Sequence, residues 1–414
     1  MKGWRKSQLG DIAVITYGYT AKASFENVGL KFLRITDIQN EMVDWSSVPY
    51  CPIDEDDLKK QKLIDQDIVF ARTGATTGKS YLVCNPPESV AASYLIRLRV
   101  QDKNVSAKFI SKYFQTREYW DNISSGISGS AQGGFNASKL SALVVPIPPL
   151  SEQKRIVSIV DEAFEVIDRA IANTEKNLTN ARELFESYLN AVFTQKGDGW
   201  EEKKIEEVCE SIIDCINKTA VSIDKPSPFK MIRTTNVRNG LINLNSVKYV
   251  TEETYHKWTR RQTPKKGDVL LTREAPMGEV GMLLTDDLVF LGQRIVSYRT
   301  NHNILDNRFL LYAFQSSNLQ DQIHAFASGS TVQHMRVPDT KVLRIATPSI
   351  SIQREVIQKL DVLLSQTQRL EAIYKQKLAA LKELKQSILQ KAFAGELTAD
   401  TANQTIKTPE DATG

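Results

Sequence analysis

The stretch Pro146–Val157 reads Pro-Ile-Pro-Pro-Leu-Ser-Glu-Gln-Lys-Arg-Ile-Val and marks an abrupt change in the character of the sequence. Its prolines forbid a helix until Ser151, whose side chain can cap one. Residues 151–193 then contain neither proline nor glycine. This composition predicts one uninterrupted helix, about 64 Å long at 1.5 Å per residue.

The same junction returns 200 residues later, where Gln153 is matched by Gln353. Residues 351–393 again lack proline and glycine, and further upstream Asp67–Arg72 is matched by Asp268–Arg273. A period of this length exceeds the roughly 50 residues of solenoid repeats. The sequence therefore predicts two copies of a whole domain, each followed by a long helix.

Composition indicates an ordinary globular protein that can bury two sizeable cores. The chain has 414 residues, of which 41% are hydrophobic and 25% charged, with a net charge of +4. No stretch approaches the roughly 18 apolar residues of a membrane span, and the N-terminus lacks the apolar core of a signal peptide. We therefore expect a cytoplasmic protein. The four cysteines are too scattered for a zinc or disulfide framework.

The part before each long helix carries short β-rich runs, such as residues 32–38, 67–70 and 94–100, broken by Gly, Pro and Asn clusters. These runs predict a mixed-sheet domain of the α/β (α+β) class. Arg34 and Arg233 fall inside predicted strands, and we expect them to be structural.

Apolar residues on both predicted helices recur in steps of three and four, which is coiled-coil spacing. Consecutive steps of four through Thr174, and again through Tyr374, predict a stutter in each helix. The predicted seam consists of Ile156, Val160, Ala163, Ile167, Leu178, Phe185, Tyr188, Leu360, Leu363, Leu370, Tyr374, Leu378, Leu381 and Ile388.

Charge favours pairing of the two helices with each other. Residues 151–193 hold five Lys and Arg against eight Asp and Glu, whereas residues 351–393 hold eight against four. Each helix would repel a copy of itself and attract the other. Two equivalent repeats are most simply related by a pseudo-twofold axis, which predicts an antiparallel coiled coil with one domain at each end.

These features together resemble the specificity subunit of type I restriction-modification systems. The resemblance rests on the Pro146–Val157 string, the tandem repeat, the opening Gly3-Trp4, the turn at Ala71–Lys79 and the ending Ala392–Thr398. It implies two target recognition domains, two helical spacer regions and a polar, flexible tail. The corresponding boundaries are 1–150, 151–193, 194–350, 351–393 and 394–414.

The resemblance also implies the function and the partners. Each recognition domain would read one half of a bipartite, asymmetric site in double-stranded DNA, at a distance set by the coiled coil. The helices would dock two DNA adenine methyltransferase subunits, and two restriction subunits that act as ATP-driven translocases would join the complex. The chain itself would be non-catalytic and bind no cofactor or metal, while S-adenosylmethionine, ATP and Mg would belong to the partner subunits.

Three segments imitate catalytic motifs but fail on detail. Gly74–Ser80 has three residues between its glycines where a phosphate-binding loop needs four. Asn85–Glu88 resembles the Asn-Pro-Pro-aromatic motif of adenine methyltransferases, yet Glu88 stands where the aromatic ring would stack on the flipped base. The acidic run Asp54–Asp57 lies beside lysines and is typical of a solvated helix start.

Sequence readout needs hydrogen-bonding side chains on loops that can enter a groove of the duplex. Polar loops in the two repeats supply the candidates, and stretches that differ between the repeats, such as 17–25 and 214–225, are expected to carry specificity. The candidate DNA-binding residues are Arg72, Thr73, Thr76, Thr77, Lys79, Ser128, Ser130, Gln132, Arg273, Glu274, Gln293, Arg294, Ser328, Ser330, Gln333 and His334.

Two other functions stay open at this point. The chain could serve a type II-like methyltransferase or nuclease, or it could be a coiled-coil scaffold whose two domains bind proteins. A scaffold would show no salt-dependent affinity for DNA. A self-contained enzyme would need a cofactor or metal constellation, which the sequence does not offer.

Overall fold

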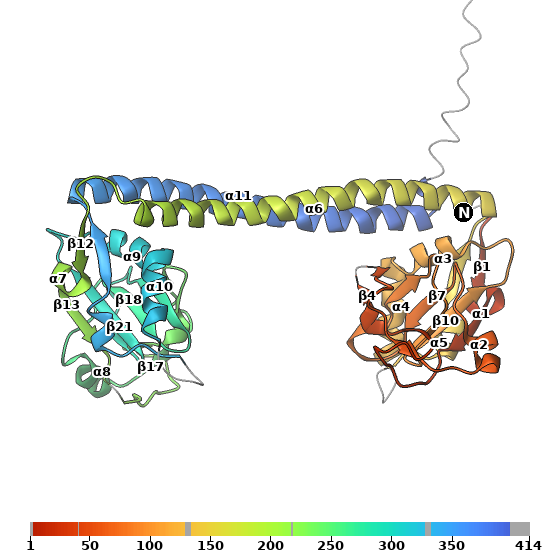
Figure 1. Cartoon of the computed structure of the whole chain (residues 1–414), viewed down its shortest axis with the longest axis horizontal. Coiled ribbons are helices and arrows are strands. Elements are labelled where there is room, and N and C mark those ends of the chain that lie inside the picture. The colour runs from red at the N-terminus through yellow and green to blue at the C-terminus, as the bar shows by residue number, and fades with distance from the viewer. Residues whose placement is uncertain (1–2, 40, 129–133, 217, 328–332, 398–414) are drawn as a thin grey trace, which may run out of the picture. The chain divides into compact units, whose positions relative to one another are not determined.

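The computed structural model describes residues 3–39, 41–128, 134–216, 218–327 and 333–397 (Figure 1). The chain forms two compact units, the first made of Met1–Thr174 with Gln376–Gly414 and the second of Glu175–Lys375. Each unit contains a head and one part of each long helix. We call the region from β1 to β11 (Arg5–Ile147) head 1, and the region from β12 to β22 (Glu201–Thr347) head 2.

Head 1 is built on a four-stranded antiparallel sheet of order β2-β10-β7-β8 and a three-stranded mixed sheet of order β6-β3-β9. Two-stranded pairs β1-β11 and β4-β5 complete it. Its elements are β1 Arg5–Gln8, α1 Leu9–Ile12, β2 Ala13–Tyr17, β3 Leu30–Leu33, β4 Ile38–Gln39, β5 Met42–Val43, β6 Tyr50–Cys51, α2 Glu55–Gln61, β7 Ile68–Ala71, β8 Ser80–Leu82, β9 Ser89–Ala91, β10 Leu95–Val100, α3 Ala107–Tyr113, α4 Arg117–Ser128, α5 Ala137–Ser141 and β11 Val144–Ile147.

Head 2 repeats this architecture strand for strand. Its sheets have the orders β13-β21-β18-β19, β17-β14-β20, β12-β22 and β15-β16. Its elements are β12 Glu201–Lys204, α7 Ile205–Val208, β13 Cys209–Asp214, β14 Lys230–Ile232, β15 Val237–Arg238, β16 Leu241–Ile242, β17 Lys248–Tyr249, α8 Glu252–Thr259, β18 Val269–Arg273, β19 Met277–Met282, β20 Val289–Leu291, β21 Ile295–Thr300, α9 Asn307–Gln315, α10 Ser317–Ala325 and β22 Arg344–Thr347. The predicted tandem α/β fold is therefore confirmed.

The expected strand at residues 32–38 is wrong in its second half. After β3 the chain turns through a 3-10 helix, Ile35–Asp37. The Asp37 carboxylate holds this turn because it accepts a hydrogen bond from the backbone N–H of Arg34 at 2.8 Å and pairs with the Arg34 guanidinium. Arg34 thus has a structural contact in a turn rather than in a strand.

The core of each head includes the ends of both long helices. These helices are α6, Leu150–Thr194, and α11, Ile350–Phe393. In the first unit the Phe393 ring lies 4.9 Å from that of Phe109 on α3. In the second unit the Phe193 ring lies 5.1 Å from that of Phe309 on α9. Each helix is thereby fixed to a head through apolar packing as well as through the chain.

A buried glutamine joins the start of α6 to head 1. Gln153 has no exposed surface, and its Oε1 accepts a hydrogen bond from the backbone N–H of Ser106 at 2.8 Å. Its Nε2 donates to the carbonyl oxygens of Asn104 and Pro148, both at 2.8 Å. One side chain therefore connects the loop before α3, the end of β11 and the first turn of the helix.

Gln353 makes the same three contacts in the second unit. Its Oε1 accepts from the backbone N–H of Asp306, and its Nε2 donates to the carbonyl oxygens of Ile304 and Pro348, all at 2.8 Å. The side-chain oxygen and nitrogen of both buried glutamines therefore have hydrogen-bond partners.

Both long helices begin one residue before the predicted start. The N–H of Gln153 already bonds the carbonyl of Pro149 at 3.0 Å, and that of Gln353 bonds the carbonyl of Ser349 at the same distance. Ser151 therefore lies inside the first turn, exposed, and is not the cap. Proline is tolerated just before the first turn because the N–H groups there have no intrahelical partner.

The two long helices pair in antiparallel fashion. In the first unit Val160 and Phe164 of α6 share an apolar cluster with Leu389 and Phe393 near the end of α11. In the second unit Leu189 near the end of α6 shares a cluster with residues near the start of α11. Among the described residues no helix is long and apolar enough to cross a membrane.

Along the middle of the seam, buried and half-buried positions on both helices alternate in steps of three and four. They are 157, 160, 164, 167, 171, 174, 178, 181 and 185 on α6, and the positions 200 higher on α11. On α11 the predicted stutter is wrong, because Leu370 is exposed and Glu371 takes its place in the seam. On α6 Ala170 and Ile171 are both half-buried. The charge of Glu371 hid the seam of α11 from an apolar count.

The predicted seam residues accordingly divide into three groups. Ile156, Val160, Ile167 and Leu360 are buried. Tyr188 and Leu370 are exposed, and Leu189 is buried in place of Tyr188. The remaining eight are half-buried, namely Ala163, Leu178, Phe185, Leu363, Tyr374, Leu378, Leu381 and Ile388.

Two charged seam residues pair across the helices. Lys385 of α11 bonds Asp168 of α6 and stands 4.5 Å from the centre of the Phe164 ring. Glu371 of α11 pairs with Arg182 of α6 at 3.2 Å. Their repeat equivalents are Phe185 and Ile171, so neither ion pair recurs at the equivalent place in the other unit.

We expect Gln153→Ala to lower the free energy of unfolding by about 2–4 kcal/mol, since it removes the partner of one backbone N–H and two carbonyl groups. Gln353→Ala should cost a similar amount. Urea or thermal unfolding of the full chain measures both. Gln358→Ala, on the exposed face of α11, is the matched control and should change stability by no more than about 0.5 kcal/mol. Equal effects of the buried and exposed substitutions would contradict the anchoring role.

Lys385→Glu should lower stability by about 1 kcal/mol at low salt, because it places a carboxylate beside Asp168. Adding Asp168→Lys should recover most of that loss, as a double-mutant cycle of the unfolding free energies would reveal. Lys382→Glu, an exposed lysine one turn away, serves as the control. A strictly additive double variant would rule out a specific pair.

Candidate nucleic-acid interface

Five predicted DNA-binding residues of head 1 lie together on the hairpin between β7 and β8, which turns through a 3-10 helix at Gly74–Thr76. Thr73 and Lys79 are exposed and Thr76 is half-buried. Thr77 is buried, and its hydroxyl donates to the carbonyl oxygen of Gly74 at 2.8 Å, so it is occupied in shaping the turn.

Arg72 directly follows strand β7, beside two exposed tyrosines. Its guanidinium lies 4.9 Å from the centre of the Tyr17 ring, and its backbone N–H bonds the carbonyl of Tyr94 at 3.2 Å. Tyr17 is 43% exposed and Tyr94 63%. Tyr17 opens the stretch 17–25 that was expected to carry specificity, whereas Tyr94 was not among the predicted contacts. The signal was available, because exposed aromatic rings beside an arginine suit contacts with bases.

In head 2 the structure brings Arg273, Glu274, Arg294 and His334 together. Arg273 is almost fully buried and donates from Nη1 to the carbonyl of Met335 at 2.7 Å. Glu274 pairs with Nε of Arg294 at 3.0 Å and forms a β-bridge with His334.

The remaining candidates are less central or fall outside the described chain. Gln293 precedes Arg294, and its Oε1 accepts from the hydroxyl of Thr219 at 3.2 Å. Gln333 is exposed. Ser128 ends α4. Ser130, Gln132, Ser328 and Ser330 lie outside the described residues.

The three segments that imitate catalytic motifs have structural roles. Gly78 has φ +94°, and a Cβ there would lie 2.8 Å from the Trp120 ring, so this glycine permits a tight hairpin. A phosphate-binding loop instead joins a strand to a helix. Glu88 pairs with Lys62 at 2.7 Å. Asp54 caps α2 by accepting from the N–H of Asp57 at 2.8 Å.

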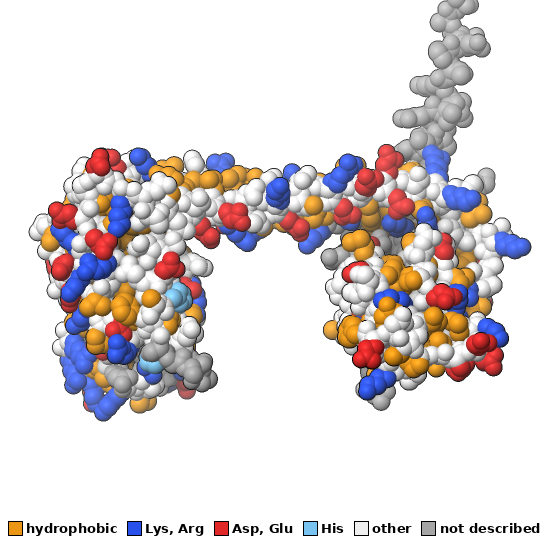
Figure 2. Space-filling view, in the orientation of Figure 1, with side chains coloured by type: hydrophobic (Ala, Val, Ile, Leu, Met, Phe, Trp, Pro, Cys, Tyr) orange, Lys and Arg blue, Asp and Glu red, His pale blue; other side chains and the backbone are white. Residues whose placement is uncertain are grey.

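Figure 2 shows lysine and arginine side chains gathered on head 2 around the helix labelled α8 in Figure 1. Exposed basic residues on α8, on the loop that follows it and on β17 form this patch, namely Lys248, Lys257, Arg260, Arg261, Lys265 and Lys266. Lysine and arginine side chains of this kind contact phosphates and position a duplex without reading its sequence.

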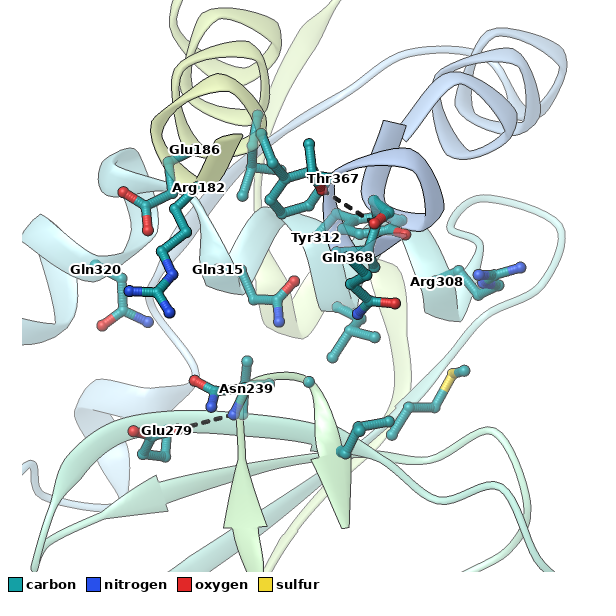
Figure 3. A pocket seen from close by; sticks show the side chains of 18 of the residues that line it. Arg182, Glu186, Asn239, Glu279, Arg308, Tyr312, Gln315, Gln320, Thr367 and Gln368 are labelled. Carbon is teal, nitrogen blue, oxygen red and sulfur yellow. Dashed lines mark hydrogen bonds between the residues drawn. The ribbon is translucent and has the colours of Figure 1, made fainter. Parts of the chain in front are cut away.

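The second unit also contains a groove of about 1210 Å³ between its two helix segments, the β15-β16 hairpin and β19 (Figure 3). Arg182 and Lys375 of its lining both pair with Glu371. Burial and the adjacent Asp361 carboxylate raise the pKa of Tyr312, whose hydroxyl donates to Asp361. Burial alone would raise the pKa of Glu371, but hydrogen bonds from Lys375 and Arg182 lower it.

Across the described residues no cluster of three or more His, Cys, Asp or Glu side chains could hold a metal ion. All four cysteines are free, and burial raises the pKa of the Cys51 thiol to about 11, which disfavours its thiolate.

One family model matches both copies of the repeat. A family model for the type I restriction modification DNA specificity domain matches residues 1–180 and again residues 197–382. The EcoBI specificity subunit of Escherichia coli is 22% identical over 96% of this chain and 86% of its own. The EcoKI specificity subunit of Escherichia coli strain K12 is 24% identical over 96% of this chain and 90% of its own.

Solved structures share the fold. A chain from a type I R-M system, studied for its complex assembly and conformational transition, has a TM-score of 0.78 and 19% identity, covering 96% of this chain and 99% of that one. The HsdS subunit from Thermoanaerobacter tengcongensis has a TM-score of 0.59 and 18% identity, covering 95% and 97%.

Proposed function

The chain belongs to the family of type I restriction-modification DNA specificity domains, and we propose that it is the DNA-specificity subunit of such a system. Each head reads one half of a bipartite, asymmetric site in double-stranded DNA. The observation that carries this proposal is the match of both copies, head and helix together, to the same DNA specificity domain. One such domain would read one half-site, so two in tandem suit a site in two parts.

The heads suit this role because they share a framework and differ at its exposed edge. Strand order is the same in both, whereas Thr73 of one head corresponds to Glu274 of the other after the matched Arg72 and Arg273. Base edges are read by such hydrogen-bonding side chains, and basic surfaces such as the one around α8 hold the backbone.

The helices α6 and α11 would dock two DNA adenine methyltransferase subunits, and two restriction subunits would join them. In this proposal the chain is non-catalytic and acts in the cytoplasm. S-adenosylmethionine, ATP and Mg²⁺ would bind the partner subunits. The support is that the relatives are named specificity subunits of type I restriction enzymes.

Two alternatives have no support in the comparisons. A subunit of a type II-like methyltransferase or nuclease would use the same heads with a different partner. A protein-binding scaffold would need no DNA affinity at all, whereas a DNA reader should lose affinity steeply as salt rises.

We expect this chain, coexpressed with the adenine methyltransferase subunit of its own system in a methylation-free host, to direct methylation to one split motif with a constant gap. The reason is that two heads fixed in one chain read two half-sites. Single-molecule sequencing of the host genome measures the motif directly.

The same methyltransferase expressed without this chain should leave no split motif. A soluble complex of the two proteins that produced no sequence-dependent methylation would contradict the proposed function and favour the scaffold.

A further inference from the structure

At one end of the four-stranded sheet, two backbone hydrogen bonds recur in both heads, and we call this arrangement the frame. In head 1 the N–H of Arg72 bonds the carbonyl of Tyr94, and the N–H of Phe135 bonds the carbonyl of Arg72 at 2.9 Å. In head 2 the N–H of Arg273 bonds the carbonyl of Arg294 at 2.8 Å, and the N–H of Met335 bonds the carbonyl of Arg273 at 3.0 Å. These hydrogen bonds make Tyr94 and Arg294 structural equivalents, although the two residues share no chemistry.

The neighbouring strand extends the equivalence. In head 1 Tyr17 lies opposite Ile96 in the sheet register, and in head 2 Asp214 lies opposite Val296. Because paired residues share a face of an antiparallel sheet, Tyr17 lies on the same face as Ile96, and the Arg72 guanidinium stacks on the Tyr17 ring. Asp214 lies on the corresponding face of the other sheet, with Val296.

The side chain of each shared arginine makes one contact within its head. Arg273 is 7% exposed and bonds the Met335 carbonyl, and Arg72 stacks on Tyr17. Nε of each arginine is buried, and among the described residues neither finds a hydrogen-bond partner. A buried N–H without a partner is costly, so each guanidinium retains one unused donor, next in the chain to Thr73 or Glu274.

The residues around these arginines differ between the heads. Head 1 has the exposed Thr73, Tyr17 and Tyr94, whereas head 2 has the half-buried Glu274 and Arg294. Oε2 of Glu274 lies 3.0 Å from Nε of Arg294, so the two side chains form an ion pair. The Arg294 side chain is 43% exposed, and its φ of +69° is unusual for a residue other than glycine. The carboxylate thus holds an arginine that stays partly accessible to a ligand.

We propose that the paired positions Thr73/Glu274 and Tyr94/Arg294 determine which bases each head reads, with Arg72 and Arg273 as positioning residues. Arg294 reads a guanine through its terminal nitrogens, since a guanidinium edge matches the O6 and N7 acceptors of guanine in the major groove. Tyr94 and Tyr17 give head 1 an apolar surface at the equivalent place, suited to the methyl group of thymine. This assignment rests on the proposed function.

The first test removes the guanidinium. With the wild-type motif known, Arg294→Ala is expected to abolish discrimination at one guanine of the second half-site while the first half-site stays unchanged. Affinity for the cognate site should fall about 10- to 100-fold relative to non-cognate DNA, as expected for loss of a bidentate contact. Arg294→Lys keeps the charge without the fork geometry, so it should relax the same position even if the alanine variant fails to fold.

Arg344→Ala is the matched control. Arg344 lies on β22 of the same head, has a side chain that is 56% exposed and pairs with Glu202, and its strand belongs to the β12-β22 pair rather than to the four-stranded sheet. Its removal should leave every position of the motif intact. If Arg344→Ala relaxed the same guanine, or if both Arg294 variants kept it, the assignment would be overturned.

The second test introduces the two head 2 residues at the equivalent positions of head 1. Thr73→Glu with Tyr94→Arg should introduce a guanine requirement into the first half-site and leave the second half-site as it was. An unchanged first half-site in a complex that still methylates DNA would refute the assignment but not the proposed function. A wild-type complex that shows no split motif would instead refute the proposed function itself.

Discussion

The hydrogen bonds of one buried glutamine in each unit fix how a long helix leaves its head. Gln153 and Gln353 each bond a backbone N–H and two carbonyls, which belong to the loop before a helix of the head and to the strand end that precedes the long helix. The glutamine side chains are themselves fully buried, and an amide is suited to this place because it offers two donors to the carbonyls and an acceptor to the N–H. The direction of α6 and α11 away from the heads depends on this contact, and the seam between the helices depends on that direction.

Matching the two halves of the sequence predicts the features that the two halves share. The helix bounds, the paired glutamines and Arg72 with Arg273 all follow from matching the two halves, since residues required by the common fold recur. The start of α6 was misplaced by one residue because serine is a favourable cap, whereas the real first turn is organised by the carbonyl of Pro149. Arg34 was misplaced because the side chain of Asp37, three residues on, diverts the strand into a turn.

The seam was less predictable because apolar periodicity ignores charged seam residues. Glu371 and Lys385 stand at positions where α6 has Ile171 and Phe185, and each is stabilised by a partner on the other helix. Such a pair cannot be recognised from one helix alone. The Lys385–Asp168 pair also favours pairing of α6 with α11, because the repeat equivalents of these residues are Phe185 and Gln368, so two like helices would lose this contact.

The residues proposed to decide recognition are the hardest to find from sequence, because they differ between the two heads, and this same difference lets each head read its own bases. Tyr94 and Arg294 differ, so no repeat signal marks them, and only the hydrogen bonds of their backbones reveal that they occupy one place. Substitution of an exposed side chain typically changes stability by no more than about 0.5 kcal/mol, whereas loss of a buried, hydrogen-bonded group costs several times as much. The frame is held by its backbone hydrogen bonds and by the contacts of Arg72 and Arg273. The exposed residues can therefore vary while the head still folds. Two copies of one fold can in this way read different bases.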